Sequence, residues 1–165
     1  MAKVLTVPLS AEGLIQAAQW LENYADSVLP KKCEELLSKM LREGEITAKI
    51  YLVPHIDTGQ TNSTIMGYRE GNSGMILAGG AAVWVEFGTG VYAPGQVDYP
   101  ISVEGIVGHG EYGEGHGADP NGWYYKDKFG EWKHTYGIPA SMFMYNTAQM
   151  LRRECHRMAK EVFSR

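Results

Sequence analysis

Apolar residues recur at helical spacing near the start of the chain. Their intervals of four and three residues predict a helix that begins at Ala11, with Ser10 as its N-cap. Pro30 either kinks this helix or opens a second one, and Gly44 is expected to end the helical stretch. Residues 1–9 are predicted to form a short extended arm. The apolar face of the first helix consists of Leu14, Ala18, Leu21, Ala25 and Val28.

A second apolar stripe of the same period runs through the C-terminal end of the chain. Ser141 is the predicted N-cap of this last helix. Because the two stripes share their period, we expect the first and last helices to pack against each other at a shallow angle of roughly 20°. The second stripe consists of Met144, Ala148, Leu151, Cys155, Met158 and Val162.

Between the two helical stretches the pattern is typical of strands. Apolar and polar residues alternate over residues 46–53, which predicts a strand. Residues 63–70 and 75–78 are expected to form a hairpin around the turn at residues 71–74. Residues 81–87 fit both periods, and we expect a short helix there.

Residues 91–130 differ in character from the rest of the chain. They are rich in Gly, Tyr and acidic residues, and they predict a long insertion loop with a hairpin around Trp123–Trp132. A short final strand is expected over residues 131–136. Together the elements predict one α+β domain of 165 residues. It would be a small, mainly antiparallel sheet of three or four strands, covered by paired N- and C-terminal helices.

Composition limits the possible function classes. The formal net charge is −4, with 44% hydrophobic and 21% charged residues. This charge argues against sequence-independent nucleic-acid binding, which needs clustered Lys and Arg, but it permits DNA to pass nearby. Because no long apolar run is present and Pro8 breaks the N-terminal patch, we expect neither a membrane span nor a signal peptide. Cys33 and Cys155 are expected to be buried free thiols of a cytosolic product.

Three short blocks of sequence stand out, one in the middle of the chain and one on each side of it. The central block, residues 81–90, reads AAVWVEFGTG and places Glu86 in an apolar run. The upstream block is Pro54-His55-Ile56-Asp57-Thr58-Gly59, followed by Ser63 and Ile65. The downstream block is Pro139-Ala140-Ser141-Met142-Phe143-Met144, leading to Ala148. In this order, the three blocks resemble a family of tail components of tailed bacteriophages. The downstream block is similar to that family's entry into its last helix, except that Met142 stands where the family has a second proline.

The resemblance implies a structural virion protein without enzymatic activity or cofactors. Such a protein is made in the host bacterial cytoplasm and becomes part of the neck or tail top, where it completes the tail and joins it to the head. It is expected to form a homo-oligomeric ring, a hexamer that matches the six-fold tail, between connector and tail-tube proteins. DNA passes through its lumen without specific binding, and no membrane is involved. The residues implied at the interface are Pro54, Asp57, Thr58, Gly59, Glu86, Phe87, Gly88, Thr89, Gly90, Pro139 and Phe143.

We interpret the two carboxylates of these blocks as structural. Glu86 is expected to accept hydrogen bonds from backbone N–H groups of the turn at residues 88–90, or to pair with a basic residue. Asp57 is expected to close its own loop in the same way. The Asp-Thr-Gly at residues 57–59 also matches the aspartic-protease signature. That chemistry needs two such carboxylates sharing a proton, whereas the chain has one Asp-Thr-Gly.

One cluster of imidazoles and carboxylates carries the alternative function, a metal-dependent hydrolase. Its residues are His109, Glu111, Glu114, His116 and Asp119. Zinc, iron and manganese use such ligands, but the glycines between them leave the backbone loose, and no His-Glu-x-x-His is present. We therefore expect a solvated loop and no metal. The same stretch contains the dinucleotide-binding pattern Gly108-x-Gly110-x-x-Gly113, which works only at the start of a helix. The residues that follow it cannot form a helix, so we do not expect a nucleotide to bind there.

Two surface features leave other interactions open. The outer face of the last helix carries the basic residues Arg152, Arg153, Arg157 and Lys160. A third hypothesis is therefore a small DNA-binding accessory protein. Tyr and Trp residues crowd into residues 92–136, where they either contact other proteins or pack back onto the sheet.

Overall fold

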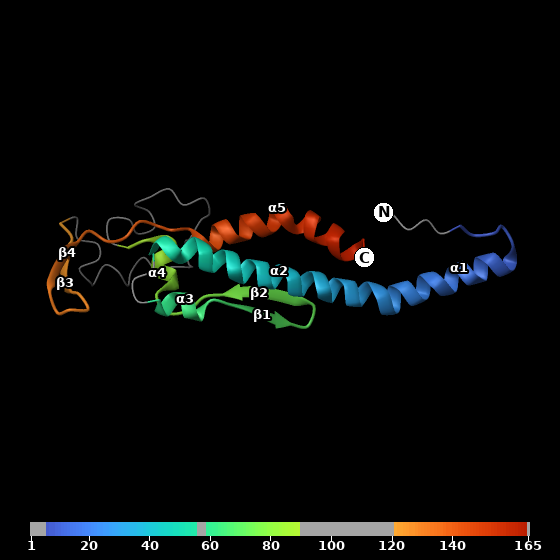
Figure 1. The fold of residues 1–165 in the computed structure, drawn as a ribbon, viewed down its shortest axis with the longest axis horizontal. Helices are drawn as coiled ribbons and strands as arrows, with labels where there is room; N and C mark the ends of the chain where they lie inside the picture. The colour runs from blue at the N-terminus through green and yellow to red at the C-terminus, as the bar shows by residue number, and fades with distance from the viewer. Residues whose placement is uncertain (1–5, 56–58, 90–120, 165) are drawn as a thin grey trace.

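The computed structural model describes residues 6–55, 59–89 and 121–164 and shows an elongated α+β fold (Figure 1). Two long helical segments, α1 (Ala11–Asn23) and α2 (Leu29–Leu52), are joined end to end by a π-helical turn. The rest of the fold lies on α2 or beyond its C-terminal end. The other elements are α3 (Gln60–Thr64), β1 (Met66–Glu70), β2 (Ser73–Leu77), α4 (Ala82–Phe87), β3 (Trp123–Lys126), β4 (Trp132–Thr135) and α5 (Phe143–Phe163).

The first helix begins where the sequence predicts. The Ser10 hydroxyl accepts a hydrogen bond from the Gly13 N–H at 3.1 Å, as an N-cap does. At Pro30 the helix continues, because the chain adopts π-helical bonding over Tyr24–Val28 and the Leu29 N–H bonds to the Tyr24 carbonyl. Such a turn accommodates a residue that has no N–H to donate. Pro30 therefore sits in the first turn of α2.

The predicted helix end at Gly44 and the predicted strand over residues 46–53 are both wrong, because α2 continues to Leu52. Gly44, Ala48 and Leu52 form one buried helical face. By contrast Ile50, which a strand would place beside Ala48 and Leu52, is 59% exposed. Close packing against neighbouring side chains explains why a glycine occupies position 44. A β-carbon there would lie 2.9 Å from Ile76 Cδ1 and 3.0 Å from Leu151 Cδ1.

The helix that pairs with α5 is α2, not α1 as the sequence predicts. Met158 and Val162 are buried, and the Lys32 ammonium donates to the Val162 carbonyl at 2.8 Å. An ion pair between Lys39 and Glu161 joins the same two helices. Helix α1 extends past the end of α5, and its stripe is exposed: Leu14 is 61% and Leu21 56% accessible (Figure 1).

Among the described residues, two separate hairpins are present and not the single sheet of three or four strands that the sequence predicts. In the first, Met66 pairs with Leu77 and Glu70 with Ser73, around the predicted turn. The predicted strand over residues 63–70 is shorter than expected, since Gln60–Thr64 is helical. The second hairpin pairs Trp123 with Thr135 and confirms the hairpin expected there.

Glu45 fastens the first hairpin to α2. Its carboxylate accepts the Gly67 N–H of β1 at 3.0 Å and the Lys49 ammonium at 2.6 Å. These two bonds, that from Lys49 first, hold the pKa of the Glu45 carboxyl below its usual range. The contact joins the hairpin to the helix near the surface.

The buried core lies at the C-terminal end of α2. It joins α2, α4 and the first turn of α5, and Phe143 is fully buried in it. The two cysteines lie away from this core. Both are free, but Cys33 is exposed and Cys155 half-buried, so the expectation of buried thiols is wrong. No described helix is long and apolar enough to cross a membrane. The core residues are Ala48, Leu52, Ile65, Ala82, Val85 and Phe143.

Candidate functional site

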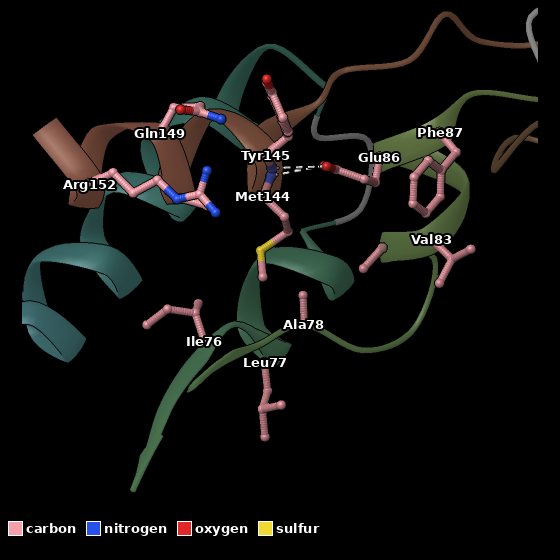
Figure 2. A pocket seen from close by; sticks show the side chains of 12 residues that line it. Ile76, Leu77, Ala78, Val83, Glu86, Phe87, Met144, Tyr145, Gln149 and Arg152 are labelled. Atoms are coloured by element: carbon pink, nitrogen blue, oxygen red, sulfur yellow. Dashed lines mark hydrogen bonds between the residues drawn. The ribbon is translucent and has the colours of Figure 1, made fainter. Parts of the chain in front are cut away.

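The side chain of Glu86 is the centre of the candidate site. It projects from α4, is only 6% exposed, and points at the start of α5 (Figure 2). One carboxylate oxygen accepts the Met144 N–H at 2.8 Å and the other accepts the Tyr145 N–H at 2.9 Å. The first N–H groups of a helix have no partner within the helix and lie at its positive end. Glu86 therefore caps α5 from another element.

Backbone hydrogen bonds reinforce this contact on both sides. The Ser141 N–H donates to the Val85 carbonyl at 2.9 Å, and the Met142 N–H donates to the Glu86 carbonyl at 3.2 Å. Further along, the Thr89 N–H donates to the Ile138 carbonyl at 2.9 Å. The Ile138 N–H returns a bond to the Thr89 hydroxyl at 3.1 Å. We call residues 85–89 and 138–145, which these bonds join, the Glu86 junction.

The sequence predicts that Glu86 has a structural role, as an acceptor of N–H groups from the turn at residues 88–90 or as the partner of a basic residue. Two donors to the carboxylate are the N–H groups of Met144 and Tyr145 in α5. In the turn, the Gly88 N–H donates to the Trp84 carbonyl and the Thr89 N–H to the Ile138 carbonyl, and Gly90 lies outside the described residues. Ser141 was the predicted cap. Its hydroxyl accepts only a long 3.4 Å bond from Phe143, and the N-cap residue is Met142, whose side chain makes no capping bond. The Glu86 carboxylate therefore provides the capping acceptor that the side chain of Met142 does not provide.

Met142 has an unusual backbone conformation for its residue type. Its φ is 53°, in the left-handed region, and no other described non-glycine residue has a positive φ. A proline, which the resembled family has at this position, is fixed near −65° and has no N–H for the Glu86 carbonyl. The departure from the family pattern therefore matches the local geometry of this chain.

Comparing two substitutions at Met142 tests this conformation. The left-handed conformation costs a residue with a β-carbon about 1 kcal/mol more than glycine. We therefore expect Met142→Gly to be more stable than Met142→Ala by about 1 kcal/mol, since both variants lose the same side chain. Urea unfolding of the two proteins measures the difference. A Met142→Ala protein as stable as Met142→Gly, or more so, would contradict the left-handed conformation.

The other predicted site residues have different surroundings. Phe87 is half-buried and Gly88 buried in the junction, while Pro139 is exposed and Phe143 lies in the core. Pro54 is exposed in a 3-10 turn, and Gly59 precedes α3 with a φ of 78°. Asp57, Thr58 and Gly90 lie outside the described residues, and so does the whole cluster of His109, Glu111, Glu114, His116 and Asp119. Among the described residues, no group of His, Cys, Asp or Glu has the arrangement of a metal site.

An apolar groove lies beside the junction, between β2, α4 and α5. Its volume is about 680 Å³. Figure 2 shows Val83 and Phe87 on one side, and Gln149 and Arg152 on the other. Sequence reasoning missed this α4–α5 groove, because β2 and α4 are close together in the chain but α5 is distant from both. Its described lining residues are Ile76, Leu77, Ala78, Ala82, Val83, Glu86, Phe87, Met144, Tyr145, Ala148, Gln149 and Arg152.

Comparisons with protein-family models, with curated proteins and with solved structures find no match to this chain. An assignment of function therefore depends on the geometry of the junction and the groove, and on the resemblance of the three sequence blocks.

Proposed function

We propose that the chain is a structural virion protein of a tailed phage or prophage, and that it forms part of the neck or tail-completion ring. One observation carries the proposal: the three blocks that resemble the tail-component family meet in one core. Ile65 comes from the upstream block, Val85 from the central block and Phe143 from the downstream block. Glu86 then bonds the central block to the downstream block. The shared pattern thus corresponds to one physical unit of this fold.

The exposed apolar surface supports an assembling protein. Soluble monomers rarely expose large contiguous apolar patches, and such patches mark contacts with other proteins. Along α1 and α2 the large apolar side chains that are 39% exposed or more are Leu14, Ile15, Trp20, Leu21, Leu29, Ile46 and Ile50. The second hairpin adds Tyr124, Tyr125 and Trp132, so both ends of the long axis offer contact surface (Figure 1).

In the proposed assembly, copies of the chain form a ring, a hexamer, between the connector and the tail tube. A closed ring needs a head-to-tail contact in which two different surfaces of the chain meet. DNA passes through the lumen, and the net charge of −4 suits a conduit that does not retain it. The ring acts through shape and contact, without chemistry or a cofactor.

Protein mass spectrometry of purified virions tests this function. Particles of the phage that carries the gene, banded on a density gradient, are expected to contain the chain at a copy number close to that of other neck proteins. The portal and major tail-tube proteins of the same particles serve as internal references. Infectious particles that lack the chain would contradict the proposed function.

A further inference from the structure

Helix α1 carries an apolar stripe with an acidic edge. Leu14, Ala18 and Leu21 are exposed on one face, and Glu22 follows Ala18 by one helical turn, which places it beside the stripe. Glu12 is the other charged residue of α1, and the helix contains no Lys or Arg. Trp20 stacks on Tyr24 on a different side of the helix. The stripe therefore presents aliphatic side chains next to negative charge.

The body of the same molecule does not reach this stripe. Helices α1 and α2 form one continuous rod, in which Leu21 and Leu52 lie roughly 45 Å apart at 1.5 Å per residue. The α4–α5 groove lies near the Leu52 end, so α1 and the groove are at opposite ends of the rod (Figure 1). Neither surface covers the other within one copy.

The α4–α5 groove complements the stripe in shape and charge. Its walls are mainly aliphatic and aromatic, which suits the apolar face of an amphipathic helix. Exposed Arg152 supplies a positive charge at the groove. The one acid among the described lining residues is Glu86, whose two oxygens already accept N–H groups of α5. The groove thus presents a positive charge to an acidic partner.

We propose that the apolar stripe of α1 docks into the α4–α5 groove of a second copy of this chain, with the acidic edge of α1 toward Arg152. The contact joins two different surfaces, so each copy donates one helix and accepts another. Repetition of this contact builds a ring when the rotation between successive copies closes. The inference rests on the proposed function, because it names the contact between the subunits of the proposed ring.

Two variants of the full chain, each with a matched control, test the contact. Leu14→Glu/Leu21→Glu charges the stripe, and Gln16→Glu/Asn23→Glu places the same charges on the opposite face of α1. Ala148→Glu fills the groove, and Asn146→Glu adds the same residue elsewhere on α5. All of these positions are exposed, so the fold is expected to be kept. Mass photometry is expected to show rings for the wild type and for both controls. Each test variant should weaken assembly more than about tenfold.

Mixing the two test variants gives the sharpest result. The Ala148→Glu chain keeps a working helix and the Leu14→Glu/Leu21→Glu chain keeps a working groove, so their mixture is expected to form one-to-one dimers that cannot grow. Circular dichroism confirms that each variant is folded. A mixture that stays monomeric, a test variant that still forms rings, or a wild type that is monomeric at every concentration would overturn the contact. Virion mass spectrometry is independent of this result: a chain present in virions whose variants still assemble refutes only the docking contact.

Discussion

Replacing Glu86 by alanine is expected to lower the free energy of unfolding by about 3 kcal/mol. The substitution removes the acceptor of two N–H groups at the start of α5, and each buried donor left without a partner costs about 1–3 kcal/mol. It also removes a negative charge from the positive end of that helix. For a chain of this size the loss corresponds to a fall in Tm of roughly 6–12 °C.

Urea unfolding followed by circular dichroism measures this loss, with Glu70→Ala as the control. Glu70 is an exposed acid on β1, and its replacement is expected to change stability by less than about 0.5 kcal/mol. Glu86→Gln keeps an acceptor of similar shape and should fall between the wild type and Glu86→Ala. A Glu86→Ala protein as stable as the Glu70→Ala control would show that Glu86 does not cap α5.

Replacing Phe143 by alanine is expected to cost about 4 kcal/mol. The side chain is fully buried among Leu52, Ile65 and Val85, and removal of a buried phenylalanine costs about 3–5 kcal/mol through lost transfer energy and the cavity left behind. This is a large share of the stability of a typical domain. The three blocks of the resemblance would lose the side chain around which they meet.

The matched control is on the same helix. Phe163 is 39% exposed near the C-terminal end of α5, so Phe163→Ala removes the same group from a site that water already reaches. We expect it to cost about 1–2 kcal/mol, the transfer energy of the part that is buried, since no closed cavity is left. Equal losses for the two variants, measured by urea unfolding, would place the core elsewhere.

The sequence predicts those parts of the fold that local physics decides. Ser10 caps α1 because an N-cap needs only a side chain and a nearby N–H. The first hairpin turns at Gly71 and Asn72, within the predicted turn at residues 71–74, because turn residues between two strands specify a hairpin. The helix with the stripe of α5 also forms; Met158 and Val162 of the stripe are buried, while Ala148 is exposed. Each of these signals is contained in a few neighbouring residues.

The parts that the sequence does not predict depend on tertiary contacts. Gly44 is a helix stop by local preference, but here it lies inside a helix, where Ile76 and Leu151 approach too closely for a side chain. Glu86 caps a helix that begins far along the chain, and no spacing rule connects it to Met144. A stripe such as that of α1 predicts an apolar face, but it does not say which molecule covers that face.

Deleting the gene from its phage and examining the lysate by negative-stain electron microscopy tests the central claim, a structural role at the neck, most directly. We expect filled heads beside separate tails of normal length if the ring joins head and tail. Overlong or unfinished tails would place the same protein at the tail terminus. Expression of the wild-type gene in trans should restore joined virions. Intact, infectious virions without the gene would contradict the structural role.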